Sequence, residues 1–173
     1  MARQRFRFDP LIHVKAEAIG LPGKRSFYLL AADGKKALRV KVDKPQLEML
    51  SLGVKQVLEQ IPEGRAGAGK PAGEQQPQTL WPGEEEVAFV AGQLGIGYEE
   101  SRDLIVLVLY DIEEASRRSP TFVGLASKDQ MEALSQEIDA VCAAGRPLCP
   151  LCQLPMNPEG HLCPRSNGHA QLV

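Results

Sequence analysis

The chain has 173 residues, of which 43% are hydrophobic and 24% charged, with a formal net charge of -2. This length fits one medium domain or two small ones. No apolar run approaches the roughly 20 residues that cross a bilayer, and no signal-peptide core follows the basic start, so we expect a cytoplasmic protein without a membrane partner.

Residues 1–61 have the pattern of three strands followed by a helix. Each predicted strand is an alternating or continuous apolar run between turn signals: Ile12–Ala18, Phe27–Ala31 and Ala37–Val42. Asp43 occupies the position of an N-cap, and Pro45 fits the first helical turn. Apolar residues then recur at helical spacing to about Gln60, which predicts an amphipathic helix.

Residues 62–83 are rich in Gly, Pro and Gln and predict a linker. After it, the same order of elements returns, with predicted strands at Val87–Gln93, Leu104–Tyr110 and Thr121–Ala126. The continuous apolar run of the second of these predicts a strand buried on both faces. Ser127 and Gln130 form a capping-box pattern before a helical stripe from Met131 to Cys142.

The two halves align at a constant offset of 84 residues. Gln46 aligns with Gln130, and several positions of the helical stripe also match in type: Leu47 with Met131, Leu50 with Leu134, Ser51 with Ser135 and Val54 with Ile138. We therefore predict a βββα unit that is used twice, against the alternative of chance similarity between two amphipathic helices. The alignment places Cys142 opposite Leu58 on the buried stripe, which predicts a core residue and not a metal ligand.

The small net charge conceals an asymmetry between the halves. Residues 1–61 carry 12 Lys and Arg against 6 Asp and Glu, whereas residues 84–142 carry 4 against 13. Mutual attraction of the halves explains this, and a basic patch for nucleic acid is the alternative. Arg3, Arg5 and Arg7 alternate with Phe6 and Phe8, as in an edge strand or an arm laid on phosphates.

The tail at residues 146–173 carries the most specific chemical signal. Cys149-Pro150-Leu151-Cys152 lets two thiolates reach one ion, and Cys163 is the third candidate ligand. His161 is the preferred fourth ligand, with His169 as the alternative. A Cys3His set is closed to water, and its softness favours one structural zinc ion over magnesium or calcium. A reduced tail without metal is the competing interpretation.

Several segments resemble a bacterial family of unknown function that is best represented in Actinobacteria. The resemblance is carried by three parts of the chain, of which the tail is the most specific: Phe8-Asp9-Pro10, Gly20–Leu29, and the tail motifs Cys149-Pro150-Leu151-Cys152, His161-Leu162-Cys163-Pro164-Arg165 and Asn167-Gly168. Members have no assigned activity. They usually carry Gly where this chain has Gln153, and an aromatic residue where it has His169, so the resemblance favours His161 as the ligand.

Other candidate sites have simpler explanations. Gly64 to Lys70 matches a phosphate loop, but Pro71 replaces the hydroxyl residue, and the expected strand and helix do not flank it. His13 lies on the polar side of its strand, which predicts a solvated side chain. A group of acidic residues is predicted to lie exposed in loops, and the alternative is a divalent-ion site or an acid–base site. The group consists of Glu99, Glu100, Asp103, Asp111, Glu113 and Glu114.

We therefore expect an α+β protein in which two pseudo-repeated βββα units, 1–61 and 84–145, pack together and a zinc-knuckle-like tail follows. The favoured function is that of a non-catalytic zinc-binding protein or adaptor with a protein partner. A nucleic-acid-binding accessory protein is one alternative, with Arg146, Arg165 and Asn167 of the tail as added polar contacts. The other is an enzyme with a cleft between the units, near the strand at 104–110. Its participants would be Tyr28, Arg25, His13 or the acidic loop. The pattern names no catalytic residue and no substrate.

Overall fold

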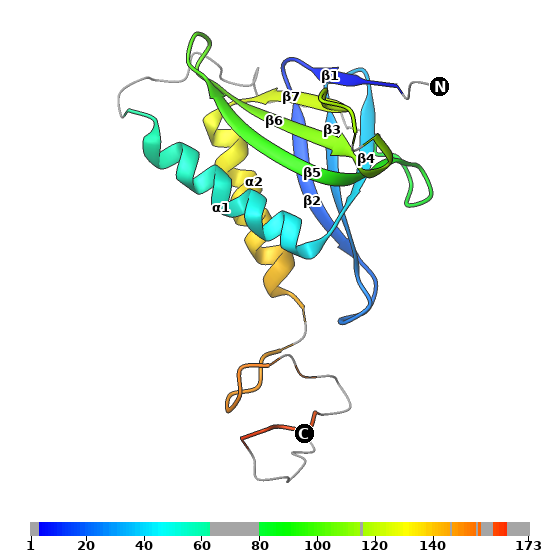
Figure 1. The fold of residues 1–173 in the computed structure, drawn as a ribbon, viewed down its shortest axis with the longest axis vertical. Helices are drawn as coiled ribbons and strands as arrows, with labels where there is room; N and C mark the ends of the chain where they lie inside the picture. The colour runs from blue at the N-terminus through cyan, green and yellow to red at the C-terminus, as the bar shows by residue number, and fades with distance from the viewer. Residues whose placement is uncertain are drawn as a thin grey trace.

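The computed structural model describes residues 4–62, 80–114, 116–145, 147–154, 156 and 161–165. Seven strands form one sheet in the order β1-β7-β6-β5-β4-β3-β2, and both helices lie on the same face of it (Figure 1). The mixed α+β class is therefore as predicted. No helix among these residues is both long and apolar enough to cross a membrane.

The predicted elements of the first half are present. Strands β2 (His13–Ile19), β3 (Ser26–Ala32) and β4 (Ala37–Val42) form an antiparallel meander, and helix α1 (Lys44–Gln60) follows. The phosphate-loop pattern at 64–70 and most of the predicted linker lie outside the described residues.

The second half forms another antiparallel meander followed by a helix. Its elements are β5 (Val87–Glu99), β6 (Leu104–Asp111), the 3-10 turn η1 (Ile112–Glu114), β7 (Phe122–Ala126) and α2 (Lys128–Ala143). Strand β5 continues beyond the predicted end at Gln93, because pairing with β6 carries it through Gly95 and Gly97. The prediction that β6 is buried on both faces is wrong. Its residues alternate between buried and half-buried, because the helices cover only one face.

Strand β1 (Phe6–Phe8) was not assigned as a strand of either unit from the sequence. It pairs parallel with β7, and Phe8 packs edge-to-face on Phe122 with ring centroids 5.4 Å apart. Of the two interpretations of the alternating Arg and Phe residues, the structure shows the edge strand. The Arg7 side chain is 64% exposed and pairs with Asp9 at 3.4 Å. Arg3 lies outside the described residues.

The two halves meet where β4 and β5 pair in parallel, with Arg39 opposite Val87 and Lys41 opposite Val90. We expected the strand at 104–110 to lie near the centre of any cleft between the halves. This is wrong, because the parallel pairing brings β5 and not β6 to the junction. The long-range contact that creates the junction left no local pattern in the sequence.

Both helices begin in the same way. The backbone N–H of Asp43 donates to Gln46 Oε1 at 2.8 Å, and that of Ser127 donates to Gln130 Oε1 at 2.9 Å. Each glutamine amide then reaches two successive carbonyls in the opposite half: Ala91 and Gly92 for Gln46, and Leu11 and Ile12 for Gln130. Reciprocal contacts of this kind are expected of two similar units. The duplication itself stays a prediction.

The helices contact each other through small buried residues at aligned positions. The hydroxyl of Ser51 donates to the carbonyl of Ser135 at 3.2 Å and to Asp139 Oδ1 at 2.6 Å. Lys55 Nζ lies 2.5 Å from Asp139 Oδ2. Together with the apolar stripes of both helices, these contacts fix α1 beside α2 above the core.

The N-cap of α2 gives a first testable prediction. Ser127 Oγ accepts the N–H of Gln130 at 3.2 Å, so Ser127→Ala leaves that donor without its partner. We expect the free energy of unfolding to fall by about 1 kcal/mol. Urea denaturation checks this, and Ser127→Asp, which can cap as well as serine, is the matched control. An unchanged midpoint for Ser127→Ala would contradict the role of the cap.

Candidate metal centre

The tail after α2 begins with a tight turn that carries two of the cysteines. The backbone N–H of Cys149 donates to the Leu154 carbonyl at 2.8 Å, and the N–H of Gln153 donates to the Cys149 carbonyl at 2.9 Å. Gln153 adopts a φ of +62°. The turn therefore places a residue with a side chain in the left-handed region, an uncommon backbone geometry that glycine adopts more easily.

The second limb carries His161 and Cys163 and lies against this turn. Arg165 Nη1 donates to the Leu151 carbonyl at 3.1 Å, which ties the two limbs together. The side chains of all four predicted ligands converge, and their ligand atoms lie within 4.8 Å of one another. Within the described part of the chain, no other group of His, Cys, Asp or Glu has a comparable arrangement. His169 lies outside the described residues.

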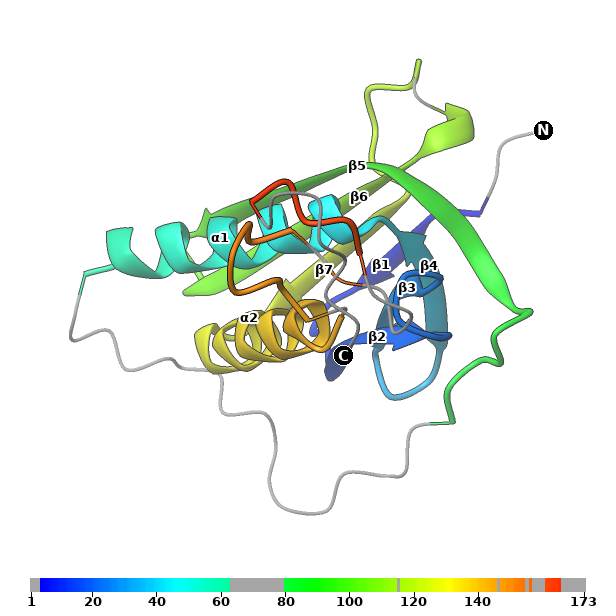
Figure 2. The ribbon, with the colours of Figure 1, turned by 90° about the horizontal axis from the view of Figure 1, so that it is seen from below.

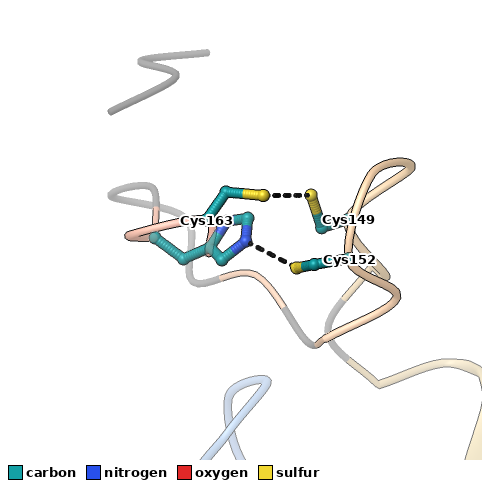
Figure 3. Close-up of side chains that lie close together, drawn as sticks. Cys149, Cys152 and Cys163 are labelled. Carbon is teal, nitrogen blue, oxygen red and sulfur yellow. Dashed lines mark hydrogen bonds between the residues drawn. The ribbon is translucent and has the colours of Figure 1, made fainter. Parts of the chain in front are cut away.

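Two of the distances between the ligand atoms are close to those of a tetrahedral site. Cys149 Sγ and Cys163 Sγ are 3.8 Å apart, and Cys152 Sγ is 3.3 Å from His161 Nε2, as the dashed lines of Figure 3 show. An ion about 2.3 Å from each sulfur holds two sulfurs about 3.8 Å apart, and a sulfur and a nitrogen about 3.5 Å apart. Both contacts fit a single zinc-sized ion between them.

Two of the four ligands are buried, and backbone hydrogen bonds favour the thiolate of one of them, Cys149. Cys149 is 1% exposed and Cys163 is 5% exposed, while Cys152 and His161 are half-buried. The hydrogen bond from the Cys152 backbone N–H, helped by that of Leu151, lowers the pKa of the Cys149 thiol despite its burial. Backbone donors that favour thiolate are a feature of metal-binding cysteine turns.

Cys142 does not belong to this centre. It lies in α2, is 9% exposed and packs within the hydrophobic core, as predicted. Burial raises the pKa of its thiol, which is the behaviour of a small core residue and not of a reactive thiolate.

The residues considered for catalysis do not converge. Arg25 Nη2 donates to the Val141 carbonyl of α2 at 2.7 Å, on the helix-covered face of the sheet. Tyr28 and His13 lie on the opposite face by strand register. The prediction that His13 is solvated is wrong at Nε2, which is buried and has no hydrogen-bond partner among the described residues. The ring of Trp81 packs edge-to-face against the His13 ring, with the two centroids 6.4 Å apart.

The acidic residues are also not a simple exposed cluster. Asp111 is 1% exposed and accepts the N–H of Glu113 at 3.0 Å. Asp103 pairs with Lys128 at 2.8 Å and accepts the hydroxyl of Tyr98. The prediction of exposed loop charge is therefore wrong for these two residues. The backbone N–H of Glu113 donates to Asp111, and Lys128 of α2 pairs with Asp103, so both carboxylates are satisfied in a buried or partly buried position.

Sequence reasoning missed the most buried cationic side chain among the described residues. Arg39 is 5% exposed, pairs with Glu17 at 2.7 Å and donates to the Pro82 carbonyl at 3.2 and 3.3 Å. Its guanidinium lies 4.9 Å from the centre of the Tyr28 ring. An arginine within the apolar run at 37–42 was the available signal. Through these contacts Arg39 of β4 fixes Pro82, in the segment before β5, against the face of the sheet.

Comparison with known proteins places the chain in a sequence family but gives no function. A family described as "Protein of unknown function (DUF3090)" matches residues 6–163. That range includes the four residues of the candidate metal centre. No curated protein and no solved structure gave a match. The expectation that the family is mainly actinobacterial stays a prediction.

Proposed function

The chain belongs to the DUF3090 family, whose function is unknown, and from its own residues we propose a non-catalytic zinc-binding protein that presents its metal-organised tail to a protein partner. The observation that carries this proposal is the convergence of Cys149, Cys152, His161 and Cys163. Three sulfur ligands and one imidazole suit zinc and disfavour magnesium and calcium, which prefer oxygen. Four protein ligands complete a tetrahedron, so a structural role follows.

The composition of the tail supports a folding role for the metal. Among its described residues only Cys149 and Cys163 are buried, so the tail has no apolar core of its own. A bound ion replaces that core, as in other small metal-dependent folds. Thiolates kept free for zinc require a reducing compartment, which supports the expectation of a cytoplasmic protein.

Exposed leucines around the centre support a binding role. Leu148, Leu151, Leu154 and Leu162 are 57, 40, 50 and 82% exposed, and each is within two residues of a ligand. A contiguous patch of exposed apolar side chains marks a site of protein contact, and four exposed leucines on one short segment could supply such a patch. Metal binding would fix their relative positions and so reduce the entropy lost when a partner binds.

This proposal predicts metal-dependent capture of a partner. Immobilised native protein is expected to retain a defined protein from its own cytoplasmic extract, and chelator-treated protein is expected to lose it. Leu162→Glu should weaken retention at least about 10-fold, because a charge replaces an exposed apolar contact. Leu21→Glu, at a residue 76% exposed on the β2–β3 turn, is the control and should retain the partner. Retention that survives both the chelator and Leu162→Glu would contradict a binding role for the tail.

A further inference from the structure

Two sulfur atoms face each other between the limbs of the tail. Cys149 of the first limb, residues 147–154, and Cys163 of the second, residues 161–165, are both free thiols. They are 1% and 5% exposed, and their Sγ atoms lie 3.8 Å apart. Cys152 Sγ lies 3.3 Å from His161 Nε2, so the four side chains form two close pairs, each with one member from each limb.

The sulfur pair is close to the geometry of a disulfide. A disulfide joins its sulfurs at about 2.0 Å, so Cys149 Sγ and Cys163 Sγ need to approach by roughly 1.8 Å. The two residues are 14 positions apart in the chain. Disulfides close loops of about this length without difficulty. The hydrogen bond from Arg165 to the Leu151 carbonyl already holds the limbs together and needs no metal.

The limbs can make this approach without disturbing the sheet. Figure 1 shows the tail, coloured orange to red, beyond the end of α2, and Figure 2 views the molecule from that end with the tail in front of the helices. Among the described tail residues only Cys149 and Cys163 are buried. No apolar core in this part of the tail therefore opposes a small movement of one limb against the other.

A disulfide and a metal ion cannot occupy this centre together. Zinc binds cysteine as the thiolate, and the sulfurs of a disulfide are no longer thiolates. The bond would consume two of the four converging ligands and leave only Cys152 and His161. Two ligands are too few for a structural zinc site, which needs four.

We infer that the centre is a thiol–disulfide switch, in which the reduced pair of Cys149 and Cys163 admits the metal and the oxidised pair excludes it. The inference deepens the proposed function and rests on it for the identity of the metal. The pairing of the two sulfurs rests on their own geometry. In a reducing compartment such a bond is transient, which is typical of redox sensing and not of a structural disulfide.

A hydroperoxide is the oxidant that this switch requires. One thiolate of the pair attacks a peroxide oxygen, the O–O bond breaks, and the departing hydroxide takes a proton to become water. The other thiolate attacks the sulfenic sulfur so formed, the S–O bond breaks, and a second water leaves. Two thiols have then lost two protons and two electrons, and hydrogen peroxide has become two water molecules. A dithiol reverses the step by two thiol–disulfide exchanges.

The test uses the full-length protein, freed of metal under reducing conditions and then treated with one equivalent of hydrogen peroxide. Peptide mapping without reduction is expected to find Cys149–Cys163 as the main disulfide. The oxidised chain should bind zinc at least about 100-fold more weakly than the reduced chain, because two ligands are lost, and dithiothreitol should restore the affinity. Protein loaded with zinc beforehand should form the disulfide at least about 10-fold more slowly, because its thiolates are bound.

Cys152→Ser is the matched control, because it keeps the facing pair and should form the same disulfide at close to the native rate. Cys163→Ser removes one sulfur of the pair and should form any disulfide at least about 10-fold more slowly. Cys149–Cys152 as the main product, or native zinc affinity in the oxidised chain, would overturn the inference. A reduced chain that binds no zinc would contradict the proposed function instead, and the mapped disulfide would still decide which cysteines pair.

Discussion

Replacing Cys152 by serine is expected to remove most of the zinc from the purified protein. The native chain, prepared without chelator, should contain close to one zinc ion, held by the four ligands that converge in the tail. A serine hydroxyl is a poor ligand for zinc, and the metal affinity should fall by more than about 100-fold, beyond the effect of losing a supporting hydrogen bond. Elemental analysis after dialysis against a competing chelator measures this.

Cys142→Ser is the matched control for this experiment. Cys142 is buried in the core, 9% exposed, and is not one of the converging ligands. The variant should keep its zinc while losing about 1 kcal/mol or more of stability, because a hydroxyl replaces an apolar thiol in the core. Stoichiometric zinc in Cys152→Ser, or zinc loss in Cys142→Ser, would refute the ligand assignment.

Replacing Arg39 by methionine is expected to lower the free energy of unfolding by about 2–4 kcal/mol. Breaking a buried ion pair costs more, about 3–5 kcal/mol, but Glu17 is 33% exposed and can recover some hydration. The change also removes both hydrogen bonds to the Pro82 carbonyl. Trp81 is the single tryptophan of the chain and should become more exposed, so its emission should shift to the red.

Lys41→Met provides the comparison for Arg39→Met. Lys41 lies two residues further along β4, on the same face, and its side chain is exposed. Substitution of an exposed side chain away from special contacts changes stability by less than about 0.5 kcal/mol. Urea denaturation and tryptophan emission should therefore be close to native. Equal losses in the free energy of unfolding of Arg39→Met and Lys41→Met would show that the Arg39 contacts do not stabilise the segment before β5.

The local patterns of the sequence predicted most elements correctly. The third strand was predicted with the observed bounds, Ala37–Val42, and the capping box at Ser127 is present. Apolar periodicity and caps depend on neighbours a few residues apart, so they can be read without the fold. The same locality explains the candidate metal centre, because four ligands within 15 residues can meet without help from the sheet.

Features that depend on distant contacts were missed or misread. Strand β1 exists because β7 pairs with it. Strand β5 continues through Gly95 and Gly97 because β6 pairs with it there. Asp103 and Asp111 carry charges that suggested exposure, yet a lysine and backbone donors beside them satisfy those charges. Arg39 is buried because Glu17 and Pro82 are placed around it by the meander and by the segment before β5.

The sequence by itself therefore determined the mixed α+β class, the two capped helices and the convergence of the Cys and His residues of the tail. Only the tertiary structure decided that the halves join through parallel pairing of β4 with β5, and that β5 continues past β4 with β6 as its only partner among the described strands. The physical reason is how far apart in the sequence the contacting residues lie. Helix caps and ligand turns are set by contacts within one short segment, whereas strand pairing is chosen by competition among segments far apart in the chain.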